Sequence, residues 1–266
     1  MGKTLLHKEI RCVGIDSPER TLLHSQIIRE KTFLRKLYTE WYAAINDLLP
    51  GRRAGCIVEL GSGGGFSKKI LPRAITTEIL PLPNVDLRLD GEELPFKDKS
   101  LEAIFMVDVF HHLPRSEQFL KEAARCIKPG GVLVMIEPWN TPWSRFIYRY
   151  FHHEPFDPDS TDWKIPVGGP LSEANSALPW IVFERDRFRF EKEYPQWRIR
   201  DIRLHTPFRY LLSGGVSMRV SMPGRLFEFW QRIEDCLGAV MKYLAMFATI
   251  VLTRSSVENS IHNKSL

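Results

Sequence analysis

Short apolar runs alternate with amphipathic segments through the first half of the chain. Residues 56–60 read Cys-Ile-Val-Glu-Leu, a run with glycines on both sides that is typical of a buried parallel strand. Further strand-like runs cover residues 74–79, 85–89, 101–107 and 132–137. Residues 116–127 carry apolar side chains at helical spacing, and the Lys-Pro-Gly-Gly sequence that follows ends this helix. Strand, helix and strand in succession predict a mainly parallel sheet with right-handed crossovers.

A helix start precedes the first strand. Asp16-Ser17-Pro18-Glu19 supplies an N-cap, a proline at the first helical position and an acid three residues after Asp16. Apolar residues then recur at helical spacing between Leu34 and Leu48, until Pro50-Gly51 stops the run. We therefore expect one amphipathic N-terminal helix within residues 16–50.

Aromatic residues and prolines are concentrated after the fifth predicted strand. Residues 138–180 hold four of the seven tryptophans and seven of the eighteen prolines, in a stretch too long for an ordinary connection. We expect an insertion folded over the edge of the sheet, within a substrate lid of residues 138–195 that is mobile before ligands bind. One short helix is predicted after Thr141-Pro142. Residues 187–194 alternate like a strand but also share a helical face that ends at Pro195, and a helix is favoured there.

The C-terminal part is predicted to form strand, helix and strand within residues 196–253. The alternation in residues 197–204 changes phase at Arg200-Asp201, which indicates a bulged strand. Residues 225–243 are helical by period, and residues 247–252 form a β-rich run expected to pair with the bulged strand. With a core at 55–137 and a disordered tail at 254–266, the chain is predicted to be a single domain of 266 residues.

Composition and charge exclude several classes of protein. Hydrophobic residues make up 44% and charged residues 26% of the chain, which excludes disordered, collagen-like and coiled-coil proteins. The net charge of +5 is too small and diffuse to indicate nucleic-acid binding, so no nucleic-acid partner is expected. The basic excess gathers in residues 185–225, which fits either a solvated face or contact with an anionic substrate or lipid headgroup.

The four cysteines contain no CxxC pair and are interpreted as reduced thiols. The N-terminus carries charge within its first ten residues and lacks the apolar core of a signal peptide. The longest apolar stretch, residues 244–252, falls well short of the roughly 20 residues that a membrane-spanning helix needs. We therefore expect a cytoplasmic protein.

A glycine-rich turn follows the first strand. A dinucleotide fingerprint would need its last glycine where Phe66 stands, and a P-loop would need Gly-Lys-Ser/Thr where the chain reads Gly65-Phe66-Ser67-Lys68. Glycines let the backbone turn tightly beneath a ligand, and the amides at the next helix start suit a carboxylate. The pattern Glu-x-Gly-x-Gly-x-Gly resembles motif I of the class I S-adenosylmethionine-dependent methyltransferases. In that family it holds the cofactor, which implies binding by Glu59, Gly61, Ser62, Gly63 and Gly65.

Four further elements follow in the order of that family. Glu78 stands 19 residues after Glu59 near the end of the second strand, where an acid can accept hydrogen bonds from ribose hydroxyls. Asp90-Gly91-Glu92-Glu93-Leu94-Pro95-Phe96 is similar to the family segment D-A-x-x-L-P-F, which implies that Asp90 binds the adenine amino group and the Gly91 backbone contacts the ring. Residues 101–113 and 127–131 resemble the fourth strand with its exit loop and the L-K-P-G-G before the fifth. Together they resemble the type 11, or UbiE-like, subgroup.

The resemblance implies a Rossmann-like, doubly wound α/β fold with a mostly parallel seven-stranded sheet and an antiparallel C-terminal strand. It implies S-adenosyl-L-methionine as cofactor and methyl transfer to a small-molecule, lipid or glycan acceptor. Contact with a membrane surface and the oligomeric state stay open. Two alternatives are a methyltransferase-like binding or scaffold protein without transfer activity, and a nicotinamide oxidoreductase, which Phe66 disfavours.

Methyl transfer is an in-line displacement that needs a base only if the acceptor carries a proton. Ligands of open α/β sheets bind at the carboxyl ends of strands, where Asp108 and His111 follow the fourth strand. Both are candidate catalytic residues, and Asp108 is also expected to contact the cofactor. A third candidate is His153, within a polar cluster of residues 152–157. No metal is expected there, because adjacent histidines on a helix point apart.

Overall fold

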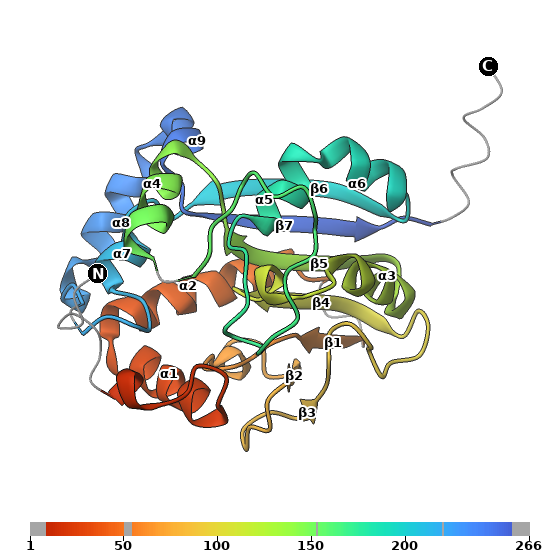
Figure 1. The fold of residues 1–266 in the computed structure, drawn as a ribbon, viewed down its shortest axis with the longest axis horizontal. Helices are drawn as coiled ribbons and strands as arrows, with labels where there is room; N and C mark the ends of the chain where they lie inside the picture. Colours follow the sequence, from red (N-terminus) through yellow and green to blue (C-terminus); the bar gives the residue numbers. More distant parts are fainter. Residues whose placement is uncertain (1–8, 51–54, 153, 220, 257–266) are drawn as a thin grey trace.

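The computed structural model describes residues 9–50, 55–152, 154–219 and 221–256. Its centre is a seven-stranded sheet in the order β3-β2-β1-β4-β5-β7-β6 (Figure 1). The strands are β1 (Cys56–Glu59), β2 (Ile75–Glu78), β3 (Leu87–Arg88), β4 (Leu101–Val107), β5 (Ile127–Pro138), β6 (Trp197–His205) and β7 (Phe247–Arg254). The first five run parallel, and β7 is antiparallel to both β5 and β6. The predicted fold class is confirmed.

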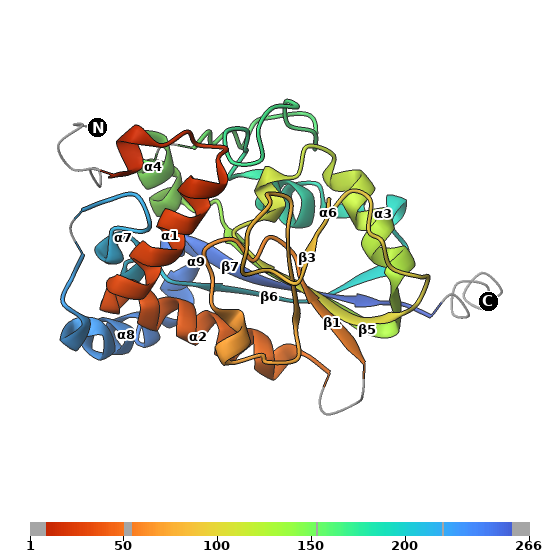
Figure 2. The same cartoon turned by 90° about the horizontal axis from the view of Figure 1, so that it is seen from below.

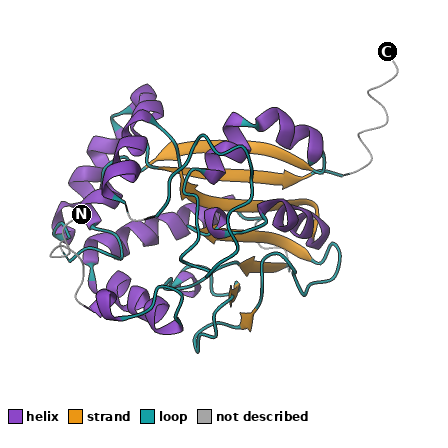
Figure 3. Ribbon diagram, viewed as in Figure 1, coloured by secondary structure: helices purple, strands orange, loops and turns teal. Residues whose placement is uncertain are grey.

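Helices cover both faces of this sheet (Figures 2 and 3). The α-helices are α1 (Pro18–Glu30), α2 (Thr32–Leu48), α3 (Ser116–Cys126), α4 (Pro142–Phe151), α5 (Leu178–Trp180), α6 (Arg187–Glu193), α7 (Arg209–Ser213), α8 (Phe227–Asp235) and α9 (Met241–Leu244). A π-helical turn, Ile181–Arg185, joins α5 to α6. Shorter 3-10 turns occupy Glu9–Cys12, Ser67–Lys69, Phe110–His112, Gly224–Leu226 and Gly238–Val240.

The single N-terminal helix predicted within residues 16–50 is wrong, because the structure has two helices there. Helix α1 starts as predicted, with the Ser17 hydroxyl accepting a hydrogen bond from the Arg20 amide. Lys31 has an extended backbone at φ −76° and ψ 96° and separates α1 from α2. Its ammonium group donates to the carbonyls of Gly215 and Met218, far along the chain. Tertiary contacts therefore fix a break that the helical period of the sequence does not show.

The bounds of two other elements also differ from those predicted from the sequence. Strand β5 begins at Ile127, five residues before the predicted start, because Ile127 pairs with Leu101 of β4. The Lys-Pro-Gly-Gly sequence therefore lies within the strand. The helix predicted over residues 225–243 is divided into α8 and α9, with Gly238 between them at φ +45°.

Three finer predictions of the second half are confirmed. The register of β6 against β7 shifts between Ile199 and Asp201, where the bulge was expected. Helix α4 begins after Thr141, whose hydroxyl accepts from the Ser144 amide. Helix α6 matches the segment predicted at 187–194.

The segment predicted as an insertion contributes to the main core. One hydrophobic cluster joins one face of the sheet to α3, α5 and α6, and it includes the buried side chains of Trp163, Phe183 and Phe190. The cluster on the other face packs α2 and α4 against the sheet. No helix of the described segments is both long and apolar enough to cross a bilayer.

Candidate active site

A cavity of about 1130 Å³ opens at the carboxyl ends of β1, β2 and β4. This is the end of a parallel sheet where ligands of open α/β folds bind. The glycine-rich turn, the ends of β2 and β3 and the exit loop of β4 form one wall. Helices α1, α2, α4 and α7 contribute most of the rest, together with residues 167–171, 214–218 and 221–223.

Hydrogen bonds to β2 hold the glycine-rich turn in place. The Ser62 amide donates to the Thr77 carbonyl at 2.8 Å, and the Ser62 hydroxyl accepts from the Thr77 amide at 3.1 Å. Gly63 has a left-handed backbone, φ +42°, and its amide donates to Glu78 Oε2 at 2.9 Å. At Gly65 a Cβ atom would lie 2.1 Å from the Tyr42 hydroxyl, so only glycine permits this approach of α2. Gly61, Ser62, Gly63 and Gly65 all line the cavity, as the sequence indicated.

Glu59 lies behind the turn. Its side chain is buried, and Glu59 is not among the described residues that line the cavity. The carboxylate accepts a hydrogen bond of 2.5 Å from the Ser67 hydroxyl. Burial raises the pKa of Glu59, and the hydrogen bond from Ser67 offsets only part of that rise. In this position Glu59 supports the turn from beneath.

Two acids predicted to bind the cofactor do line the cavity. Glu78 is the last residue of β2, and its second carboxylate oxygen accepts from the Ile79 amide at 2.9 Å. Burial raises the pKa of Glu78, against the lowering effect of the amides that it binds. Asp90 follows β3 and accepts from the Glu92 amide at 2.8 Å, with Gly91 beside it on the wall. The structure therefore brings both acids and the glycine-rich turn to one cavity.

Thr21 is a site residue that the sequence did not reveal. It lies on α1, lines the cavity, and is close enough to Gly63 that a Cβ on that glycine would be 3.6 Å from the Thr21 methyl group. Its buried hydroxyl has no hydrogen-bond partner within the described residues. An unsatisfied buried hydroxyl costs free energy, so a polar ligand beside the turn would satisfy it. The turn, the acids and Thr21 together fit the carboxylate, ribose and adenine of S-adenosylmethionine.

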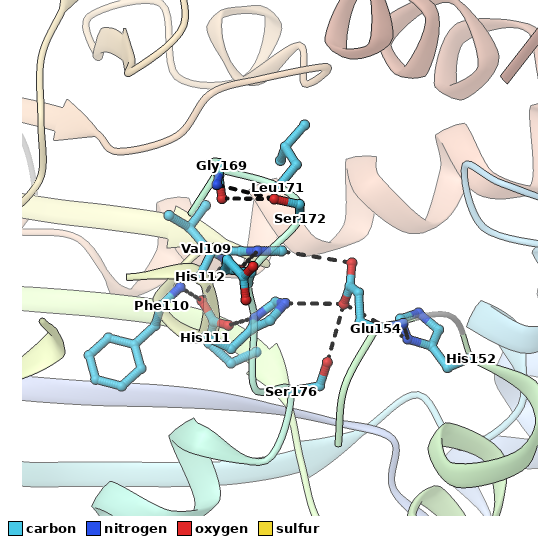
Figure 4. A network of polar contacts seen from close by, with 12 residues as sticks. Val109, Phe110, His111, His112, His152, Glu154, Gly169, Leu171, Ser172 and Ser176 are labelled. Carbon is cyan, nitrogen blue, oxygen red and sulfur yellow. Dashed lines mark hydrogen bonds and ion pairs between the residues drawn. The ribbon is translucent and has the colours of Figure 1, made fainter. Parts of the chain in front are cut away.

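A buried network of acids and histidines lies next to the cavity (Figure 4). His111 Nδ1 donates to Glu137 Oε2 at 2.8 Å, and His111 Nε2 lies 3.4 Å from Glu154 Oε2. Glu137 also accepts from the amides of Val109 and Phe110, which fixes the turn after β4. Burial alone would lower the pKa of His111, but Glu137 and Glu154 raise it well above the ordinary value. His111 is therefore protonated near neutral pH, and it is not among the described residues on the cavity wall.

Asp108 does line the cavity, at the end of β4. Its backbone is left-handed, with φ +63°, a conformation that costs energy in a residue other than glycine and often marks a functional position. Burial raises the pKa of Asp108 to about 7, although the charge of His111 opposes the rise. Burial lowers the pKa of His112, also on the wall, to about 4, so that it is neutral at pH 7. His153, the third predicted catalytic residue, lies outside the described residues.

Side chains that could act as metal ligands are close together in this network. The candidate ligand atoms of His111, His112 and Glu154 lie within 4.8 Å of one another, and so do those of Asp108, His111 and Glu137. Both sets share His111, whose ring nitrogens already face two carboxylates. A cation would have to replace the protons of this histidine.

The remaining wall of the cavity is largely apolar. It includes Tyr38, Ile28, Ile147, Phe151, Tyr210, Leu212, Val216, Met218, Met222 and Met246. The polar wall that was predicted to bind the cofactor and this apolar wall therefore meet in one space, which Asp108 also lines. The sequence did not predict that these residues share a cavity, because they come from α1, α2, α4, α7, the loop after α7 and the residue before β7.

Comparisons with known proteins show that part of the chain is similar to methyltransferases. Residues 58–135 match the type 11 family model described as "Methyltransferase domain". The chain is 32% identical over 130 residues to demethylmenaquinone methyltransferase of Tropheryma whipplei, covering 37% of this chain and 54% of the relative. It is 29% identical over 133 residues to 2-methyl-6-phytyl-1,4-hydroquinone methyltransferase of Synechocystis, covering 43% of this chain and 40% of the relative. The chain thus spans about half of the length of these relatives or less.

A solved structure shows the same fold over most of the chain. Geranyl diphosphate C-methyltransferase of Streptomyces coelicolor superposes with a TM-score of 0.51 at 14% identity, covering 91% of this chain and 90% of that protein. That structure contains S-adenosyl-L-homocysteine. The family model and the relatives confirm the predicted resemblance of residues 58–135 to type 11 methyltransferases, and with it the predicted cofactor.

Proposed function

We propose, from the premise that residues 58–135 are a class I S-adenosylmethionine-dependent methyltransferase domain, that this protein transfers a methyl group to a lipid acceptor. One observation carries the proposal: the glycine-rich turn, Glu78 and Asp90 open into the same cavity as a wall of aliphatic and aromatic side chains. A cavity with a few polar groups on one side and apolar groups on the other suits a charged cofactor beside an apolar acceptor.

The bound cofactor supplies an electrophilic methyl group. Glu78 and Asp90 would hold its ribose and adenine, and the amides of the glycine-rich turn would face its carboxylate. The apolar wall would exclude water and align the acceptor with the methyl group. These residues would contribute most of the rate enhancement, because an in-line displacement depends mainly on position.

Asp108 is the group best placed to accept a proton from the acceptor. It lies on the cavity wall, and its pKa of about 7 matches a base that works near neutral pH. His111 was also a candidate from the sequence, but it is buried behind the wall between Glu137 and Glu154. We assign His111 a positioning role: its positive charge stabilises the surrounding carboxylates and fixes the turn that carries Asp108.

The proposed class of acceptor rests on the apolar wall of the cavity and on the names of the two relatives. The name of one relative contains a quinone and that of the other a phytyl-substituted hydroquinone. A ring with a long apolar chain fits a wall built from Phe151, Leu212, Met222 and Met246 better than a glycan does. We therefore propose an acceptor with a ring hydroxyl or ring carbon and a lipid chain.

Two measurements test the function. Titration calorimetry should show binding of S-adenosylhomocysteine and no binding of NADH. Incubation with S-adenosylmethionine carrying a labelled methyl group and phytyl hydroquinone should place the label in the lipid. Binding without transfer to this or other quinol lipids would favour the scaffold alternative, and binding of NADH alone would favour an oxidoreductase.

Asp108→Asn tests the proton acceptor. Asparagine tolerates the left-handed backbone at this position, so the fold should be retained. For a hydroxyl acceptor, kcat should fall roughly 100-fold to 10,000-fold. The wild-type rate should rise with pH through about 7, because only ionised Asp108 accepts a proton, and the variant should lose that rise. Asp235→Asn, at an exposed acid of α8, is the matched control. An unchanged pH profile in Asp108→Asn would exclude Asp108 as the base.

A further inference from the structure

Helix α4 exposes aromatic side chains on the face that points away from the core. Its inward face packs Ser144, Ile147 and Tyr148 into the protein. Outward, Phe146 and Tyr150 are 49% and 63% exposed. Removing aromatic side chains from water is favourable. A well-packed helix that keeps such side chains exposed on its outer face therefore indicates a binding surface.

The same face is basic. Helix α4 carries Arg145 and Arg149 and no acidic residue. Helix α9 lies beside α4 (Figure 1) and carries Lys242 and Tyr243 without an acid of its own, although Lys242 also lines a smaller pocket with Glu184 and Asp201. Among the described residues, none of these three cations forms a salt bridge. Hydrogen bonds from Tyr148 to Met246 and from Thr141 to Ala245 hold the two helices together.

This surface is continuous with the mouth of the cavity. The ring of Phe146 lies 5.7 Å from that of Phe151, which is 47% exposed and also lines the cavity. Leu211 and Val167 are further exposed apolar residues of the rim. An acceptor that leaves an apolar medium at α4 would therefore pass apolar side chains on its way into the site.

We infer that α4 and α9 form a docking surface for an anionic phospholipid bilayer. Aromatic rings with nearby arginines and lysines suit the interface between headgroups and acyl chains, where the rings enter the boundary and the cations pair with phosphates. A soluble anionic partner would not need the exposed rings, and a second copy of this surface would bring like charges together. Docking to a bilayer does not depend on methyl transfer. The proposed function supplies only a reason for docking, which is the delivery of a lipid acceptor.

Sedimentation with vesicles tests the inference in the absence of cofactor. The full chain should bind vesicles of phosphatidylcholine with phosphatidylglycerol more tightly than vesicles of phosphatidylcholine alone. The double variant Arg145→Gln/Arg149→Gln should lose roughly 30-fold in affinity for the anionic vesicles, at about fivefold per arginine. Phe146→Ser/Tyr150→Ser should lose at least about tenfold on both kinds of vesicle. None of the four residues lines the cavity within the described part of the chain.

Phe188→Ser is the matched control. Phe188 is 81% exposed on α6, a helix separate from α4 and α9 (Figure 1), and the arginines beside it pair with Glu191 and Glu193. This variant should bind vesicles like the wild type, and circular dichroism should show that every variant is folded. Equal loss in Phe188→Ser, no binding by the wild type, or no loss in either double variant would overturn the inference. A dimer in gel filtration that Phe146→Ser/Tyr150→Ser abolishes would assign the surface to self-association instead.

Discussion

Single residues determine the shape of the cofactor wall. Gly63 supplies a left-handed backbone and Glu78 a carboxylate, and one hydrogen bond of 2.9 Å joins them. The bond leaves the carboxylate at the cavity wall, where it can accept further hydrogen bonds. The backbone conformation of Gly63 therefore positions the carboxylate of Glu78 on the next strand. Each of the two residues can be tested by a single substitution.

Gly63→Val should abolish measurable binding of S-adenosylmethionine. A β-branched residue is strained at φ +42°, and its side chain would extend beside the turn where the ligand must lie. Gly130→Val is the control, because Gly130 has φ +81°, has open space around its Cβ position and does not belong to the described cavity wall. It should lose stability but bind the cofactor normally in calorimetry. Unchanged affinity in folded Gly63→Val would remove the turn from the site.

Glu78→Ala should weaken cofactor binding by about 10-fold to 150-fold, the effect of losing one charged hydrogen bond worth roughly 1.5 to 3 kcal/mol. Glu93→Ala, at an exposed acid near Asp90 but absent from the described cavity wall, should change affinity little. Calorimetry with S-adenosylhomocysteine measures both. A change below about threefold in Glu78→Ala would contradict the ribose role.

At the scale of elements, the predicted lid divides into fixed and exposed parts. Trp163, Leu178 and Ile181 are buried in the core on the α3 face of the sheet. Between them, residues 167–171 form the cavity rim. The amides of Leu171 and Ser172 donate to the Asp16 carboxylate at 2.7 and 2.9 Å, which ties this rim to the chain just before α1. Partial burial raises the pKa of Asp16, but these hydrogen bonds lower it overall.

Hydrogen exchange should locate the moving part of the lid. Without ligand, amides of residues 166–170 should exchange fast and those of residues 132–136 slowly, because exposed loops open more easily than central strands. Cofactor and acceptor should slow exchange in the rim. Asp16→Ala should speed exchange at Leu171 and Ser172, whereas Asp159→Ala, at an exposed acid of the insertion that is absent from the described cavity wall, should not affect them. Equal protection of residues 138–180 and 132–136 without ligand would show that the whole insertion is fixed.

At the scale of the whole molecule, a buried ion cluster joins the N-terminal and C-terminal helices. Arg209 of α7 donates to Glu234 of α8 at 2.5 Å and to both carboxylate oxygens of Glu40 of α2 at 2.6 and 2.8 Å. Arg209 and Glu234 are buried, and the guanidinium stacks on Phe227 with its centre 4.9 Å from the ring. This cluster holds the helices that form the apolar wall against the rest of the domain.

Arg209→Met should lower the free energy of unfolding by about 3 to 5 kcal/mol, because it leaves Glu234 buried without its partner. Arg203→Met removes the exposed partner of Asp201 and should cost less than about 1 kcal/mol. Urea titration followed by circular dichroism compares them. Equal losses in the two variants would mean that the cluster does not hold the helices together.

Most of the sheet and one half of the candidate site could be predicted from the amino-acid sequence. Strand positions, the bulge in β6, the start of α4 and the glycine-rich turn depend on alternation, caps and glycine conformations, which act over a few residues. The spacing from Glu59 to Glu78 and Asp90 follows from strand and loop lengths in a parallel sheet. Local physics therefore indicated the glycine-rich turn, and the family resemblance assigned Gly61, Ser62, Gly63 and Gly65 to cofactor binding.

The remaining features of the fold and of the site depend on tertiary contacts. The break at Lys31 depends on carbonyls of residues 215 and 218, and Thr21 reaches the site only because α1 turns at that break. Burial placed Glu59 behind the turn and His111 between two glutamates, and it raised the pKa of Asp108 to about 7. Such properties depend on which distant groups surround a side chain and remove it from water, and residue spacing along the chain does not specify those neighbours.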